Sequence, residues 1–67
     1  MTDTFLRLDD VTRITGVPRS TIYDLMKRGQ FPEQIKLSDR MVAWSAAEIA
    51  SWQQDRIAKR DRQLATA

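Results

Sequence analysis

Apolar residues recur at helical spacing in a short segment near the N-terminus, "LDDVTRITG" at residues 8–16. Val11 and Ile14 stand three residues apart, as on one face of a helix. Asp9 is placed to cap the N-terminus of this helix, and Gly16 follows the last periodic residue, where glycine commonly ends a helix. The pattern predicts a helix of about two turns.

The next apolar residues predict a second short helix, from about Pro18 to Arg28. A proline is favoured at the first helical position because its missing N–H costs nothing there. Gly29 suits the left-handed conformation that ends many helices. The buried face follows the i, i+3, i+4 rule and consists of Ile22, Leu25 and Met26.

After this helix the pattern becomes alternating. Ile35 and Leu37 alternate with polar residues, "SDR" supplies turn-forming residues, and 41–44 is a second β-compatible run. We predict a two-stranded hairpin, which is marginal alone in water and therefore has to lie against the helices. The contacts are expected through Phe31, Ile35, Leu37, Val42 and Trp44.

A third helix is predicted after Ser45, because Ser45 and Glu48 have the spacing of a capping box. The large apolar residues of this segment are Ile49, Trp52, Ile57 and Leu64. The first pair is spaced to face the core, whereas the second pair is isolated among charged residues. The last turns are therefore expected to leave the core, and the final residues to fray.

Two short helices joined through a glycine turn, with a hairpin directly after the second helix, describe a winged helix-turn-helix. The expected fold is mainly α with a small β-hairpin, and it consists of three helices and a two-stranded wing. We place this domain at residues 5–57 and a C-terminal helical extension at residues 58–67.

Composition narrows the classes of function. The 67 residues include no cysteine and no histidine, so neither a disulfide nor a common zinc site is available. The sequence has no glycine-rich phosphate loop, and no paired-carboxylate pocket from which a chain this short could exclude water. We expect no enzyme activity, no cofactor and no metal.

Neither export nor membrane insertion is expected. No apolar run approaches the roughly 18 residues that span a bilayer. The start, "MTDTFLRLDD", is acidic where a signal peptide is basic and then apolar. We therefore expect a cytoplasmic protein without a membrane partner.

The charge balance is mild, but its distribution is uneven. Eleven Lys and Arg against nine Asp and Glu give a net charge of +2, which does not by itself indicate a nucleic-acid partner. The cations concentrate in the middle and in the C-terminal part of the chain. Local positive patches are expected there.

The face of the second helix opposite its apolar residues is rich in hydrogen-bond donors. The N-terminal residues of a recognition helix are the ones that reach base edges in the major groove of DNA. Arginine binds guanine bidentately, hydroxyl groups bind phosphate or bases, and a tyrosine hydroxyl reaches a phosphate. The candidate DNA-binding residues of this helix are Arg19, Ser20, Thr21, Tyr23, Lys27 and Arg28.

Each of these residues also has a purely structural interpretation. The arginine can be a solvated charge, and Ser20 and Thr21 can satisfy N–H groups at the helix start. Tyr23 can cover the edge of the core. Asp24 repels phosphates unless it accepts from a cytosine amino group or pairs with Arg28, and we favour the intrahelical pair.

The hairpin adds a second set of candidates. "KLSDR" places Lys36 on the outgoing strand, Ser38 at the tip and Arg40 at the start of the return strand. These residues can touch the DNA backbone or the minor groove, and the alternative is that they are only solvated. The charges of "DRIAKRDRQ" are typical of an exposed helix face, with contact to DNA or to a neighbouring copy as the alternative.

Several motifs follow one another in a fixed order between residues 5 and 57. They are "RSTIY" at 19–23, the G-x-FP turn at 29–32, the "KLSDR" wing and the spacing of Trp44, Glu48, Ile49 and Trp52. On these motifs the segment resembles the AlpA family of phage and prophage regulators. These are small winged-helix proteins related to excisionases and to the DNA-binding domains of MerR-type regulators.

The resemblance implies a transcriptional regulator of a phage, prophage or other mobile element that binds double-stranded DNA sequence-specifically. The residues that it assigns to recognition are Arg19, Ser20, Thr21 and Tyr23, with Arg40 as the wing contact. The first alternative is an excisionase-like factor that binds and bends DNA, and the second is a protein-interaction module without DNA binding.

Partners follow from the same interpretation. One recognition helix reads only a few base pairs, so a second copy on an adjacent half-site is expected on DNA. Integrase or RNA polymerase is the further protein partner that we consider.

Overall fold

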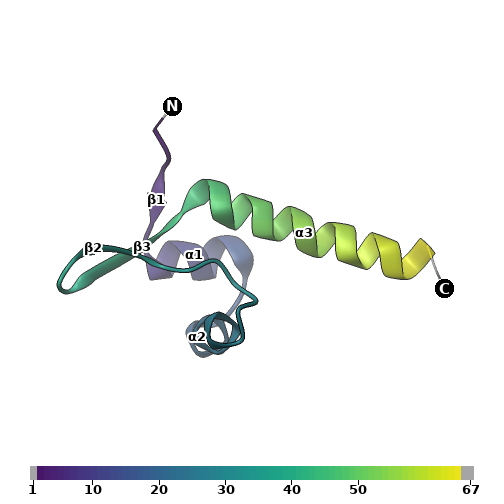
Figure 1. Cartoon of the computed structure of the whole chain (residues 1–67), viewed down its shortest axis with the longest axis horizontal. Coiled ribbons are helices and arrows are strands. Elements are labelled where there is room, and N and C mark those ends of the chain that lie inside the picture. Colours follow the sequence, from purple (N-terminus) through teal and green to yellow (C-terminus); the bar gives the residue numbers. More distant parts are fainter. Residues whose placement is uncertain (1, 66–67) are drawn as a thin grey trace.

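Residues 2–65, the part that this computed structural model describes, form three helices and three short strands (Figure 1). The elements in chain order are β1 (Phe5–Leu6), α1 (Leu8–Thr15), α2 (Arg19–Lys27), β2 (Ile35–Ser38), β3 (Met41–Ser45) and α3 (Ala46–Ala65). The expected winged helix-turn-helix is confirmed, with β2 and β3 as its wing. The wing and the far end of α3 point to opposite ends of a molecule 47 Å long.

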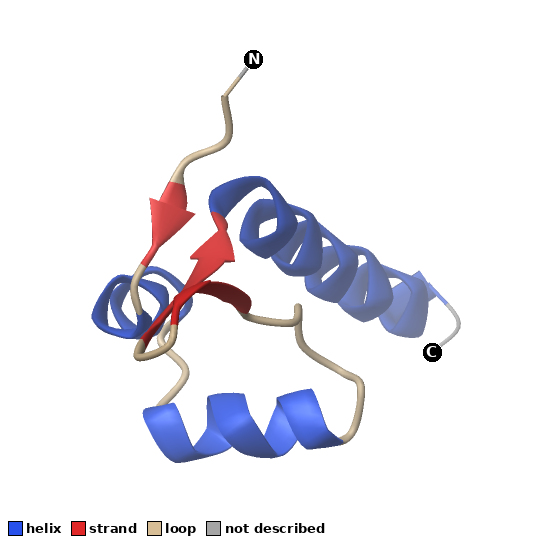
Figure 2. Cartoon of the chain, turned by 60° about the vertical axis from the view of Figure 1, so that its left-hand side comes forward, coloured by secondary structure: helices blue, strands red, loops and turns tan. Residues whose placement is uncertain are grey.

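The sheet has one strand more than we predicted. Its order is β1-β3-β2, so that β3 lies in the centre (Figure 2). In β1, Phe5 pairs with Ser45 and Leu6 with Trp44, antiparallel to β3. A strand of two residues is too short to produce a recognisable alternation of apolar and polar positions, which is why the sequence indicated only the hairpin.

The wing hairpin has the expected course but a different tip. β2 and β3 pair antiparallel, and their register shifts between Lys36 and Ser38, as in a β-bulge. Ser38 belongs to β2 rather than to the tip, and Arg40 lies in the turn rather than in the return strand. The prediction was wrong here because the alternation of side chains does not reveal an extra residue in one strand.

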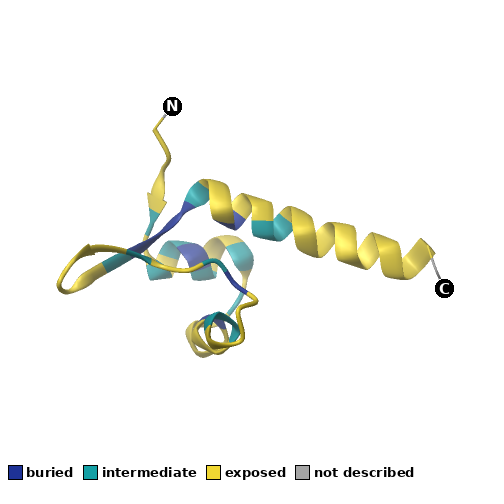
Figure 3. Cartoon of the chain, viewed as in Figure 1, coloured by how far each residue is buried: buried dark blue, intermediate teal, exposed yellow. Residues whose placement is uncertain are grey.

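The core lies where the two short helices and α3 meet the sheet. Its buried side chains are Val11, Ile22, Phe31, Trp44 and Ile49. Figure 3 shows these buried positions in the middle of the molecule. One expected contact is wrong, because Leu37 is 41% exposed. Leu37 lies in β2, and Figure 1 shows that β2 belongs to the wing that projects past the helices. Ile14, which shares a predicted apolar face with Val11, is 47% exposed.

The turn between α1 and α2 begins at Gly16, as predicted. Gly16 has a φ of 75° and donates its N–H to the carbonyl of Thr12 at 2.8 Å. The hydroxyl of Thr15 donates to the carbonyl of Val11 at 2.7 Å and accepts the N–H of Val17 at 3.2 Å. Backbone groups at the end of α1 are thereby satisfied, and the turn is held in one conformation.

The start of α1 differs from the prediction. The helix begins at Leu8, after Arg7 in an extended conformation, and no side chain caps it. Asp9 therefore lies in the first turn instead of at the cap. In that position its carboxylate forms an ion pair with Arg19, the first residue of α2.

Helix α2 begins one residue later and ends one residue earlier than predicted. Pro18 is its N-cap residue, and Arg28 is its C-cap residue. Gly29 then takes a φ of 69°, as predicted. The N–H groups of Gly29 and Gln30 donate to carbonyls of the last turn at 3.0 and 2.8 Å, which is the Schellman arrangement.

The two tryptophans hold the loop between α2 and β2. The indole N–H of Trp52 donates to the carbonyl of Gln30 at 2.8 Å, and that of Trp44 to the carbonyl of Pro32 at 3.1 Å. Phe31, between these two residues in sequence, meets Trp52 edge-to-face with 4.8 Å between the ring centroids. The loop is fixed to the sheet and to α3, which determines where the wing begins relative to α2.

The N-terminus of α3 is capped by Ser45, whose hydroxyl accepts the N–H of Glu48 at 3.1 Å, as the capping box predicted. Asp3 adds a contact from a distant segment. Its carboxylate accepts the hydroxyl of Ser45 and, at 3.2 Å, the N–H of Ala47. The hydrogen bond from Ser45 is the main cause that lowers the pKa of the Asp3 carboxyl.

The last turns of α3 leave the core, as expected, and residues 54–65 are all exposed (Figure 3). The division into a domain at 5–57 and an extension at 58–67 stays a prediction, as does fraying at the end. Residues 66 and 67 lie outside the described residues. In the described part of the chain, no helix is both long and apolar enough to cross a membrane.

Candidate nucleic-acid interface

All nine candidate DNA-binding residues are exposed. Five lie in α2, one is its C-cap residue, two lie in β2 and one lies in the wing turn. In that order they are Arg19, Ser20, Thr21, Tyr23 and Lys27, then Arg28, then Lys36 and Ser38, and finally Arg40.

A hollow of about 480 Å³ lies between the start of α1, the helix α2 and the wing. It is lined by Arg7, Leu8, Asp9, Arg19, Tyr23, Arg40 and Val42. We call it the arginine hollow, because three arginines face one aspartate there and its wall carries an excess of positive charge. A concave basic surface concentrates anions from solution.

Three of the nine candidates meet at the arginine hollow: Arg19, Tyr23 and Arg40. The helix-turn-helix and the wing thus contribute to one surface. The other candidates do not line it, and they are Ser20, Thr21, Lys27, Arg28, Lys36 and Ser38. They remain exposed elsewhere on α2 and on β2.

Two candidate positions differ in how their charges are paired. Arg19 forms its ion pair with Asp9 through one terminal guanidinium nitrogen. Arg28 pairs with Asp24 in the same helix, with 3.2 Å between Nε and Oδ2. This second pair is the one that we favoured for Asp24. It offsets the negative charge that would otherwise repel a phosphate from the exposed face of α2.

Sequence reasoning missed Arg7 and misassigned Asp9, although both line the arginine hollow. Because Leu6 pairs with Trp44, Arg7 comes to lie beside β3, the strand that follows the wing turn. That placement depends on β1, which had no recognisable pattern. The only local signal was the position of Arg7 directly before a predicted helix.

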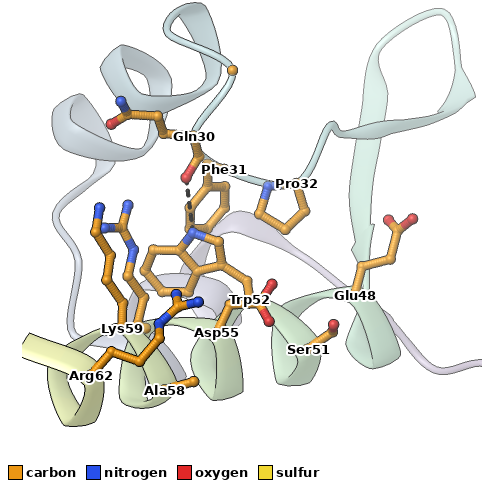
Figure 4. A pocket seen from close by; sticks show the side chains of 12 residues that line it. Gln30, Phe31, Pro32, Glu48, Ser51, Trp52, Asp55, Ala58, Lys59 and Arg62 are labelled. Atoms are coloured by element: carbon orange, nitrogen blue, oxygen red, sulfur yellow. Dashed lines mark hydrogen bonds between the residues drawn. The ribbon is translucent and has the colours of Figure 1, made fainter. Parts of the chain in front are cut away.

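A second hollow, of about 710 Å³, lies between the loop at 29–32 and α3 (Figure 4). We call it the α3 groove. Trp52 lies at its centre, and the guanidinium of Arg56 stacks 5.2 Å from the centroid of the indole. Lys59 and Arg62 line the same groove, together with the carboxylates of Glu48 and Asp55. None of the nine candidate DNA-binding residues lines the α3 groove. The groove is linked to the wing through the loop at 29–32, which forms one of its walls.

Residues that commonly bind metal ions do not gather in the described part of the chain. Between residues 2 and 65, no three carboxylates come close enough to hold a metal ion, and the sequence contains no histidine or cysteine. The arrangement that remains is one of hydrogen-bond donors and positive charge on exposed elements.

Comparison with known proteins matches most of this chain to one protein family. A family described as "Prophage CP4-57 regulatory protein (AlpA)" matches residues 4–57. The chain belongs to the AlpA family. The match runs from just before β1 into α3, so the helix-turn-helix, the wing and the arginine hollow all lie in the AlpA segment. The AlpA family is one of prophage regulatory proteins.

One relative of this AlpA-family chain is a protein of Enterobacteria phage P4, described as "Uncharacterized protein ORF88". It is 45% identical over 58 residues, which are 87% of this chain and 66% of the phage protein. The chain thus spans slightly less than two thirds of the length of that relative. The shared segment includes most of the described fold.

Proposed function

We propose that this AlpA-family protein is a transcriptional regulator that binds double-stranded DNA sequence-specifically through α2 and the wing. The observation that carries the proposal is the arginine hollow, where Arg19 of the recognition helix and Arg40 of the wing turn line one exposed basic surface. The regulatory description of the AlpA family supports it.

The dimensions of α2 fit a DNA groove. With its side chains an α-helix is about 10–12 Å in diameter, and the major groove of B-DNA is about 12 Å wide, so the nine residues of α2 can lie in the groove. Arg19 is the first residue of α2, and Ser20 and Thr21 follow it, all exposed. These three side chains lead into the groove and contact base edges, with Arg19 suited to the O6 and N7 atoms of guanine.

Most of the remaining candidates suit the phosphate backbone. Lys27 lies at the opposite end of α2 from Arg19, where the helix leaves the groove. Tyr23 and Arg40 line the hollow, and Lys36 is exposed on β2. Backbone contacts fix the register of a protein on DNA without carrying sequence information. Two copies on adjacent half-sites supply the specificity that one helix lacks.

The proposal is tested by the affinity for duplex DNA as a function of salt. Binding to phosphates releases counterions, so log K is expected to fall linearly as log salt rises, by about 0.9 per phosphate contacted. A flat dependence would sink the proposal and favour a protein-interaction module.

Two substitutions separate the roles of the helix and the wing. Arg19→Ala is expected to relax the base preference at one position of the DNA site. The variant should lose about 1–3 kcal/mol of binding free energy to DNA that carries the preferred base at that position. Arg40→Ala is expected to weaken all sequences alike and to make the salt dependence shallower. If both variants bind like the wild type, the assignment of these residues is wrong.

Footprinting on DNA that flanks the protein's own gene distinguishes the two DNA-binding roles. Protection at a promoter is expected for a transcriptional regulator. Protection of repeated sites beside an attachment site, with bending of the DNA, would instead indicate the excisionase-like role.

A further inference from the structure

The arginine hollow contains three cations that are not equivalent. Arg19 is paired with Asp9, whereas neither Arg7 nor Arg40 has an ion-pair partner within residues 2–65. We propose that this difference gives the arginines two kinds of contact with DNA. Asp9 directs Arg19 to a base edge, and Arg7 joins Arg40 in binding the phosphate backbone. The inference rests on the proposed DNA-binding function and assigns roles to two residues outside the nine candidates.

The first step of the argument concerns charge. A phosphate that approaches Arg19 also approaches the carboxylate of Asp9, because the two side chains are in contact. Like charges repel over a Debye length of about 8–10 Å at physiological salt. The O6 and N7 atoms of guanine are neutral acceptors and meet no such repulsion. An arginine neutralised by its own aspartate therefore prefers a base edge to a phosphate.

The second step concerns the hydrogen-bond donors of Arg19. Asp9 is bound by a single terminal nitrogen of the guanidinium, and a guanidinium carries several N–H groups in a planar fork. Donors remain free for a bidentate contact to guanine while the contact to Asp9 persists. The carboxylate also restricts the rotation of a long side chain that is 64% exposed, so less rotational freedom is lost on binding.

The third step concerns Arg7 and Arg40. They reach the hollow from the residue before α1 and from the turn of the wing. Within residues 2–65 neither guanidinium is paired with a carboxylate, and Tyr23, whose side chain ends in a neutral donor, lines the same hollow. Two unpaired guanidinium groups and a hydroxyl match the oxygens of a phosphodiester. The backbone contact thus falls to these residues and not to Arg19.

Asp9→Asn tests the role of the carboxylate, and Asp10→Asn is its matched control. Both aspartates lie in the first turn of α1, but Asp10 pairs with Arg13 and does not line the hollow. The probes are a random-sequence duplex and a duplex selected by the wild-type protein from a random library. Circular dichroism verifies that each variant is folded.

For Asp9→Asn we expect tighter binding to the random duplex, by roughly five- to ten-fold at 0.1 M salt, and a log–log salt slope steeper by about 0.9. Binding to the selected duplex changes less, so the ratio of specific to random affinity falls. Asp10→Asn alters both affinities by the same small factor and preserves the ratio. Asp9→Glu keeps the negative charge and restores the ratio towards that of the wild type.

The coupling to Arg19 is tested in the double variant. In an Arg19→Gln background, Asp9→Asn is expected to leave the ratio of specific to random affinity unchanged, because the side chain that Asp9 directs is missing. Arg7→Gln is expected to weaken both duplexes by one factor and to make the slope shallower by about 0.9.

Two results would overturn the inference while the proposed function stands. One is that Asp9→Asn and Asp10→Asn have the same ratio of affinities, and the other is that Arg7→Gln leaves both affinities and the slope unchanged. A wild-type protein that binds no duplex at all would instead refute the proposed function itself.

Discussion

Asp9 of α1 and Arg19 of α2 form an ion pair that joins the two helices of the helix-turn-helix. The side chains are 79% and 64% exposed, so solvent screens the interaction. We expect Asp9→Asn to change the free energy of unfolding by less than about 1 kcal/mol. Urea denaturation at neutral pH measures this, with Asp10→Asn for comparison. A much larger loss of unfolding free energy would show that the ion pair contributes to the stability of the fold and does not act mainly in binding.

Trp44 and Trp52 are expected to differ in their importance for stability. Trp44 is fully buried and Trp52 only half-buried. Trp44→Ala is expected to cost about 3–5 kcal/mol, which is comparable to the whole stability of a domain of this size, at about 0.05–0.15 kcal/mol per residue. The variant is therefore expected to be largely unfolded by circular dichroism, whereas Trp52→Ala stays folded. Equal losses would contradict this picture of the core.

Asp3 makes the stability depend on acid pH. Its pKa is lowered from 3.8 in the folded protein, chiefly by the hydrogen bond from Ser45. A lowered pKa means that the stabilisation is present above 3.8 and is lost as the pH falls through the lower folded value. Thermal unfolding of Asp3→Asn is expected to occur below the wild-type temperature at neutral pH.

The gap between the two melting temperatures should close as the solution is acidified below pH 3.8, the ordinary value of this carboxyl. Ser45→Ala removes the donor and should reduce the pH dependence in the same window. A gap that is constant down to the most acidic condition would show that the Asp3 carboxylate is not the titrating group.

The extension at residues 58–67 is expected to be dispensable for folding. Residues 58–65 are exposed along α3 and none of them belongs to the core. Deletion of 58–67 is expected to cost less than about 1 kcal/mol, or a shift in melting temperature of about 4–8 °C at most for a chain of this size. Differential scanning calorimetry measures both. Loss of cooperative unfolding would mean that the domain extends beyond residue 57.

Helix ends and caps could be predicted from the sequence because the hydrogen-bonded groups that form them are close together in the chain. Gly29 ends α2 through bonds to carbonyls of the last helical turn, and Ser45 caps the N–H of Glu48, three residues on. Both are properties of a single turn of backbone. Helix positions and the buried face of α2 could be predicted on this basis.

Contacts between distant segments could not be predicted in the same way. The bond between Asp3 and Ser45 joins residues 42 positions apart, and no periodicity encodes it. Arg7 reaches the hollow only because β1 pairs with β3, and a strand of two residues leaves no pattern. The candidates on α2 and in the wing could therefore be named from the sequence, whereas Arg7, whose position depends on the pairing of β1 with β3, was missed.

The hydrogen bonds from the two indoles to the loop at 29–32 make the tryptophans intrinsic fluorescence probes of that loop. The chain contains two tryptophans, and both donate to carbonyls of this one loop, at Gln30 and Pro32. Indole emission responds to hydrogen bonding and to the surroundings of the ring. Intrinsic fluorescence therefore reports on the segment that connects the recognition helix to the wing. A shift of the wing relative to α2 can be followed in this way without an attached dye.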